Sequence, residues 1–83
     1  MLDNLTYDDS EPPSIGLAPP GATWAQVHDH IKIAHDFLLV QMDAEWAGAY
    51  WTGTEMVVLS GLGDDSDDAL DEFREELRQR GEL

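Results

Sequence analysis

The 83-residue sequence has no cysteine and only four basic residues, one lysine and three arginines. Without cysteine, neither disulfides nor a zinc knuckle can reinforce so small a core. We therefore expect one domain with a thin core, for which homodimer formation is a common remedy. The lack of cysteine also fits a reducing compartment.

Long apolar runs are absent too. No stretch approaches the ~20 apolar residues of a membrane helix. Residues 1–4 lack the basic start and the apolar segment of a signal peptide. These features predict a cytoplasmic protein, located in the host cytoplasm if a phage encodes it.

Acidic residues are abundant. The chain has 18 Asp and Glu, a formal net charge of −14 and a pI near 4.1. A surface of this kind repels nucleic acids and anionic membranes and attracts basic proteins. The hydrophobic fraction of 42% is too high for a wholly disordered chain. Composition therefore favours a folded domain with a basic protein as its partner.

The N-terminal segment, residues 1–21, is acidic and rich in proline. The run Asp8-Asp9-Ser10-Glu11 leads into Pro12-Pro13, and Pro19-Pro20-Gly21 closes the segment. Paired prolines favour extended backbone and exclude helix. We expect a flexible or extended arm, attached to the core at most through a few apolar side chains. Residues 22–83 are expected to form the compact domain.

A first helix is predicted to begin at Thr23, because Thr23 and Gln26 have the spacing of a capping box. Residues 37–60 contain three apolar runs separated by short turns. They predict a three-stranded antiparallel meander. The alternative is one long helix over 24–46, ending near Gly48 and followed by a single hairpin.

The last element is a helix predicted from Asp67 to Arg80, with Ser66 as its N-cap and Gly81 as its stop. Leu70, Phe73 and Leu77 form its apolar stripe. The predicted fold class is thus α+β: helix, three-stranded meander and helix, preceded by the N-terminal arm.

Catalytic and metal-binding patterns are weak. His28 and His35 would share a helix face and His30 would point elsewhere, which indicates a solvated polar face rather than a zinc site. Residues 64–68 satisfy the EF-hand pattern only in part, and an acidic helix N-terminus explains them without a ligand. No nucleophile motif is present. We predict a protein without enzymatic activity, cofactor or metal.

The outer face of the last helix is the predicted partner-binding surface. Its acids lie about 5–6 Å apart, a spacing comparable to that of successive phosphates. The predicted binding residues are Asp64, Asp65, Asp67, Asp68, Asp71, Glu72, Glu75 and Glu76.

In size and charge alone, the chain resembles the broad class of DNA-mimic proteins, which includes phage anti-CRISPR and anti-restriction inhibitors. This resemblance implies binding and inhibition of a basic, nucleic-acid-binding protein. Three alternatives stay open. The first is that the acidity is an adaptation to molar salt. The second is that the chain is an antitoxin or immunity protein, and the third that it is a small enzyme or metal protein.

Overall fold

The computed structural model describes residues 2, 4–10 and 12–83. They form a small α+β domain with two helices and one five-stranded mixed sheet of strand order β1-β2-β3-β4-β5. The strands are Thr6–Asp8, Ile15–Leu17, Phe37–Met42, Glu45–Trp51 and Met56–Leu59. All neighbouring strands are antiparallel except β2 and β3, which are parallel and joined by α1.

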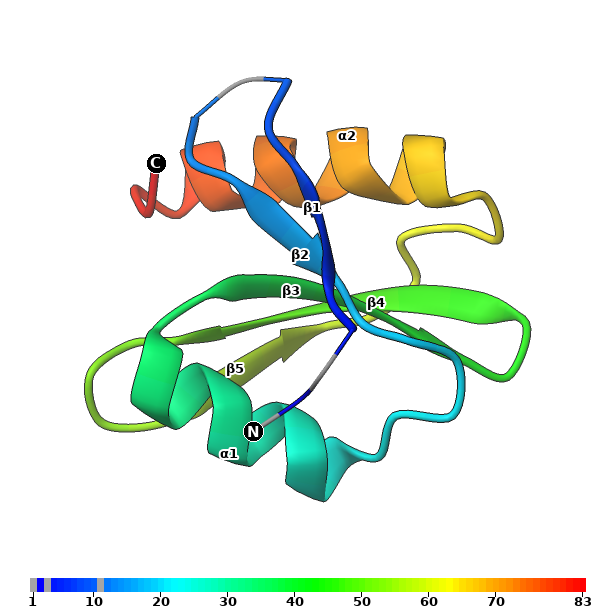
Figure 1. Cartoon of the computed structure of the whole chain (residues 1–83). Helices are drawn as coiled ribbons and strands as arrows, with labels where there is room; N and C mark the ends of the chain where they lie inside the picture. Colours follow the sequence, from blue (N-terminus) through cyan, green and yellow to red (C-terminus); the bar gives the residue numbers. More distant parts are fainter. Residues whose placement is uncertain (1, 3, 11) are drawn as a thin grey trace.

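The helices α1 (Trp24–Ala34) and α2 (Ser66–Gln79) cover opposite faces of the sheet. Figure 1 shows the three layers, with α1 below the sheet and α2 above it. Alternation along β3 explains this arrangement, because successive side chains point to opposite faces of a strand. Leu38 and Val40 pack in the core cluster of α1, whereas Leu39 packs with Phe73 and Leu77 of α2.

The start of α1 is the capping box predicted from the sequence. The Thr23 side chain accepts a hydrogen bond from the Gln26 backbone N–H, and the Gln26 side chain accepts one from the Thr23 N–H. The helix ends at His35, whose φ of 57° is in the left-handed region. The alternative of a long helix over 24–46 is therefore wrong.

The sheet differs from the predicted three-stranded meander. The segments β3, β4 and β5 run antiparallel within it, but β1 and β2 extend it to five strands. Both additional strands come from the segment predicted to be a flexible or extended arm. The prolines of this segment flank the strands, where a missing N–H does not interrupt the ladder.

Gly48 sets how closely α2 approaches the sheet. A Cβ atom placed on Gly48 would lie 2.5 Å from Cδ1 of Phe73, whose side chain is fully buried. The Phe73 ring therefore rests directly on the β4 backbone. This contact fixes the height of the helix above the sheet, and with it the position of the acidic outer face of α2.

Candidate functional site: an acidic surface on α2

The inward stripe of α2 consists of Ala69, Phe73 and Leu77, all fully buried. Leu70, predicted to belong to the stripe, lies beside it and is partly buried. The i, i+4 spacing of the buried residues directs the acidic side chains of the helix outward. The prediction of an acidic outer face therefore agrees with the burial pattern.

The predicted partner-binding residues all lie on this outer face or in the turn before it. All are exposed except Glu76, which is partly buried. We call this set the α2 acidic surface: Asp64, Asp65, Asp67, Asp68, Asp71, Glu72, Glu75 and Glu76.

The helix begins differently from the prediction. Its N-cap is Asp65, not Ser66, and the Asp65 carboxylate accepts a hydrogen bond of 2.8 Å from the Asp67 backbone N–H. An ionised cap both satisfies a free N–H group and interacts favourably with the positive end of the helix dipole. Asp65 thus has a structural role in addition to its charge.

The charge of the surface is uneven along α2. Toward the C-terminal end, Arg78 pairs with Glu75 at 3.2 Å and Arg80 with Glu76 at 3.6 Å. Within the residues that the structure describes, no ion pair involves Asp64, Asp67, Asp68, Asp71 or Glu72. The uncompensated negative charge is therefore concentrated on the N-terminal half of the helix.

A second acidic segment lies next to α2. Arg74 is buried and donates a hydrogen bond of 3.1 Å to the carbonyl oxygen of Pro13, in the turn between β1 and β2. In the same turn, hydrogen bonds from the Ser10 hydroxyl and backbone N–H lower the pKa of Asp8, and the charge of Arg74 acts in the same direction. Arg74 therefore holds the β1–β2 turn against α2, which the sequence did not predict.

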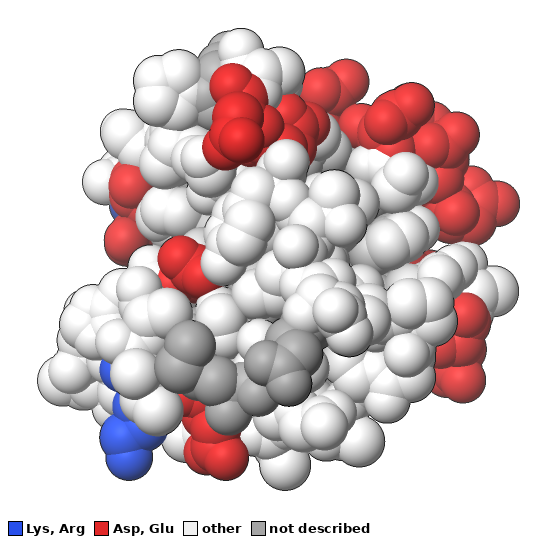
Figure 2. Space-filling model, viewed as in Figure 1, with Lys and Arg blue, Asp and Glu red and all other residues white. Residues whose placement is uncertain are grey.

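Figure 2 shows the result. The largest group of acidic side chains lies at the upper right, over the N-terminal end of α2, and another lies at the top, near the β1–β2 turn. A surface depression of about 370 Å³ adjoins the start of α2 and is lined by Ala44, Glu45, Gly61, Gly63 and Asp64. Two of its lining residues are acids, so the negative surface continues into the depression.

The histidines differ most from the predicted solvated face. His30 is only 3% exposed, whereas His28 is partly buried against Trp51 and His35 ends the helix in solvent. His30 follows Val27 at i+3 on the inward side of α1, and this spacing was the signal that sequence reasoning overlooked.

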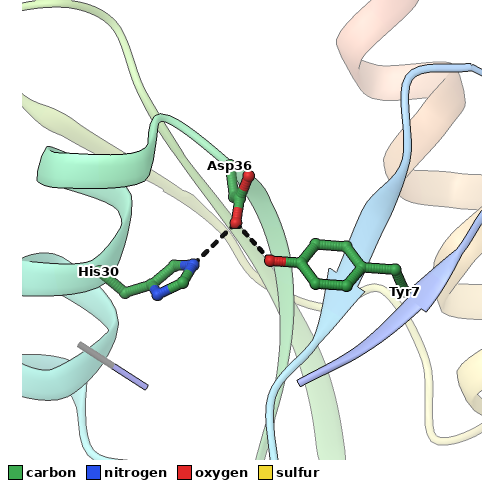
Figure 3. Close-up of polar contacts among 3 residues, drawn as sticks. All are labelled: Tyr7, His30 and Asp36. Carbon is green, nitrogen blue, oxygen red and sulfur yellow. Dashed lines mark hydrogen bonds and ion pairs between the residues drawn. The ribbon is translucent and has the colours of Figure 1, made fainter. Parts of the chain in front are cut away.

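The buried His30 belongs to a polar cluster with Asp36 and Tyr7. The His30 Nε2 atom lies 2.7 Å from Asp36 Oδ2, and the Tyr7 hydroxyl donates to the same oxygen at 2.6 Å (Figure 3). An ionised carboxylate can only accept, so Nε2 carries the proton. The buried Nδ1 has no hydrogen-bond partner among the described residues.

This cluster joins the edge strand β1 to the α1 layer. The Tyr7 side chain packs over Gly16 of β2, where a Cβ atom would lie 3.2 Å from Tyr7 Cε1. Its hydrogen bond to Asp36 raises the pKa of Tyr7 to about 12, and burial and the charge of Asp36 add to the shift. The Nδ1 atom is enclosed, so the arrangement supports a structural role rather than proton transfer to a substrate.

No group of three or more potential metal ligands occurs among the residues that the structure describes. In the same part of the chain, neither helix has the length and apolar content needed to cross a membrane. No protein-family model, curated protein or solved structure matches the sequence or the fold. Function is therefore inferred from the surface itself.

Proposed function

We propose that this domain binds a basic, nucleic-acid-binding protein through the α2 acidic surface and inhibits it by occupying its nucleic-acid site. The observation that carries the proposal is the uneven distribution of charge. The helix α2 contains six carboxylates and two arginines, whereas α1 contains one carboxylate and one lysine.

An adaptation to molar salt would require acids over the whole surface, because each carboxylate would serve to hydrate its own neighbourhood. Exposed acids also occur elsewhere, but five acids without an ion pair among the described residues lie together on α2 and its preceding turn, with the β1–β2 turn held beside them. A rigid helix packed on a glycine presents these charges in a fixed array, which suits recognition of a basic groove. The chemistry is the same whether the target is a nuclease or a basic toxin.

The test compares two variants of equal net charge. The first removes four acids at the α2 acidic surface: Asp64→Asn, Asp68→Asn, Asp71→Asn and Glu72→Gln. The second removes four exposed acids elsewhere: Asp29→Asn, Asp43→Asn, Glu55→Gln and Glu82→Gln. Basic proteins retained from a host lysate on the immobilised domain at low salt would be identified and purified, and their binding to duplex DNA measured with each variant present.

We expect the parent domain and the second variant to displace the DNA, and the first variant to lose most of this competition through slower association. Binding of the purified target should weaken steeply as salt is raised. Equal loss in both variants would show that only net charge matters and would contradict a specific surface. A target that binds the domain and DNA simultaneously would contradict inhibition by mimicry.

A further inference from the structure

The two edges of the sheet are built differently. The edge strand β1 has three residues, ends in Asp8 and is followed by Asp9. Short length and charge are common protections against pairing with another sheet. The other edge strand, β5, has the sequence Met-Val-Val-Leu, without charge or proline, and among the described residues it pairs with β4 alone. It therefore offers an unprotected row of backbone donors and acceptors.

Side chains on both faces of β5 are incompletely covered. Met56 is partly buried against the α1 cluster and Val57 against the α2 cluster. Val58 is 42% exposed. A further strand beside β5 would cover apolar surface on both faces as well as pair the free backbone groups.

We propose that β5 forms the interface of a symmetric homodimer, in which β5 of a second copy pairs with it in the antiparallel direction. Such a pairing uses the same surface on both copies and extends the sheet across them. In a register centred on Val57, Met56 lies opposite Val58 of the second copy, so the cross-strand contacts are apolar.

Charge favours this edge for contact between two copies of net charge −14. Within residues 46–63 the one charged residue is Glu55, and the proposed register places it opposite Leu59, not opposite another carboxylate. The acids of α2 face away from the sheet, whereas pairing at β5 extends the sheet sideways. The α2 acidic surface consequently stays free in the dimer, and the proposal does not depend on the proposed function.

The test measures the mass of the full chain by sedimentation equilibrium over a range of concentration and salt. We expect a species of twice the 9.2 kDa chain mass, and a dimer fraction that rises with salt because the like charges are screened. Binding of a basic target weakens with salt, so the two proposals fail in distinguishable ways.

Two substitutions of opposite charge separate strand pairing from general electrostatics. Val58→Lys and Val58→Glu should both raise the dimer dissociation constant by about tenfold or more, because each places a charge in an apolar cross-strand contact. Val58 is exposed, so both variants should keep the far-ultraviolet circular dichroism of the parent. The matched controls are Thr6→Lys and Thr6→Glu on the exposed surface of β1, which should leave the constant within about twofold.

A monomer at every concentration and salt would overturn the proposal. So would a dimer that Val58→Lys strengthens and Val58→Glu weakens, because that pattern indicates attraction between charged surfaces. Loss of the dimer in the Thr6 variants would place the interface at β1 and also contradict it.

Discussion

The two helical layers of this domain differ in how they use polar residues. The α1 layer encloses a histidine that shares the Asp36 carboxylate with Tyr7, and its helix carries one acid. The α2 layer has an almost wholly apolar inner side, in which Phe73 rests on Gly48, and six acids in the helix. Acidic residues are therefore denser in the α2 helix than in the α1 helix, which is why we relate the acids of α2 to binding.

The largest expected effect tests the apolar contact of α2. Phe73→Ala removes a fully buried ring and should lower the free energy of unfolding by about 3–5 kcal/mol, measured by chemical denaturation. A smaller deletion in the α1 layer, Ile31→Val, removes one methylene of a fully buried side chain and should cost about 0.5–1.5 kcal/mol. If Phe73→Ala costs no more than Ile31→Val, the ring does not anchor α2.

Sequence patterns identified the parts of the fold that depend on local chemistry. The capping residues Thr23 and Gln26 and the stop at Gly81 are predictable because each involves neighbours in the chain. The strands β1 and β2 were missed because three residues have no periodicity, and because β2 pairs with β3 in parallel across the whole of α1. Nearby prolines reinforced the interpretation as an arm.

The candidate site was predictable to a similar extent. The acids of α2 follow from helical spacing, so their exposure could be expected. Arg74 and Pro13 are 61 residues apart in the sequence, so no local pattern indicates their contact. The spacing of His30 from Val27 could have predicted that His30 is buried. A histidine is, however, usually assigned to the surface on its polarity alone.

A smaller effect is expected from Gly48→Ala. The added Cβ would lie within 3 Å of three atoms of the Phe73 ring, which is enclosed on all sides. We expect a loss of about 1–3 kcal/mol in the free energy of unfolding. Combining Gly48→Ala with Phe73→Leu should recover part of it, so the double-mutant cycle should show coupling. Additive losses would mean that α2 does not rest on this glycine.

The polar cluster of the α1 layer is tested by His30→Leu, which keeps most of the volume and removes the donor to Asp36. We expect a loss of about 1–2 kcal/mol by chemical denaturation, because Asp36 is partly exposed and water replaces some of the lost bond. A stabilised variant would show instead that the cost of burying the Nδ1 atom without a partner exceeds the stabilisation from the hydrogen bond.

The dependence of the melting temperature on salt tests where the repulsion between acids is concentrated. Raising ionic strength from low to physiological values should raise the melting temperature of the parent by about 4–8 °C, the shift that about 1 kcal/mol produces in a domain of this size. The variant lacking four acids at the α2 acidic surface should show a clearly smaller rise in melting temperature than the variant lacking Asp29, Asp43, Glu55 and Glu82. Equal rises would show that repulsion is spread evenly, and unfolding until salt is molar would support adaptation to a saline environment.

The smallest effect concerns Tyr7. Its pKa of about 12 in the folded protein lies above the ordinary tyrosine value of 10.0. The hydrogen bond to Asp36 therefore contributes stability that is complete below pH 10 and disappears as the pH rises toward 12. Tyr7 is 41% exposed, so solvent limits this contribution, and ultraviolet absorption of the phenolate reports it better than denaturation.

Subtracting the titration curve of Tyr7→Phe from that of the parent should isolate a transition near pH 12. Asp36→Asn removes the charged acceptor and should move that transition toward pH 10, whereas Asp29→Asn on the exposed side of α1 should leave it in place. A Tyr7 that titrates near pH 10 in the parent would mean that the edge strand β1 is not held to the α1 layer by this hydrogen bond.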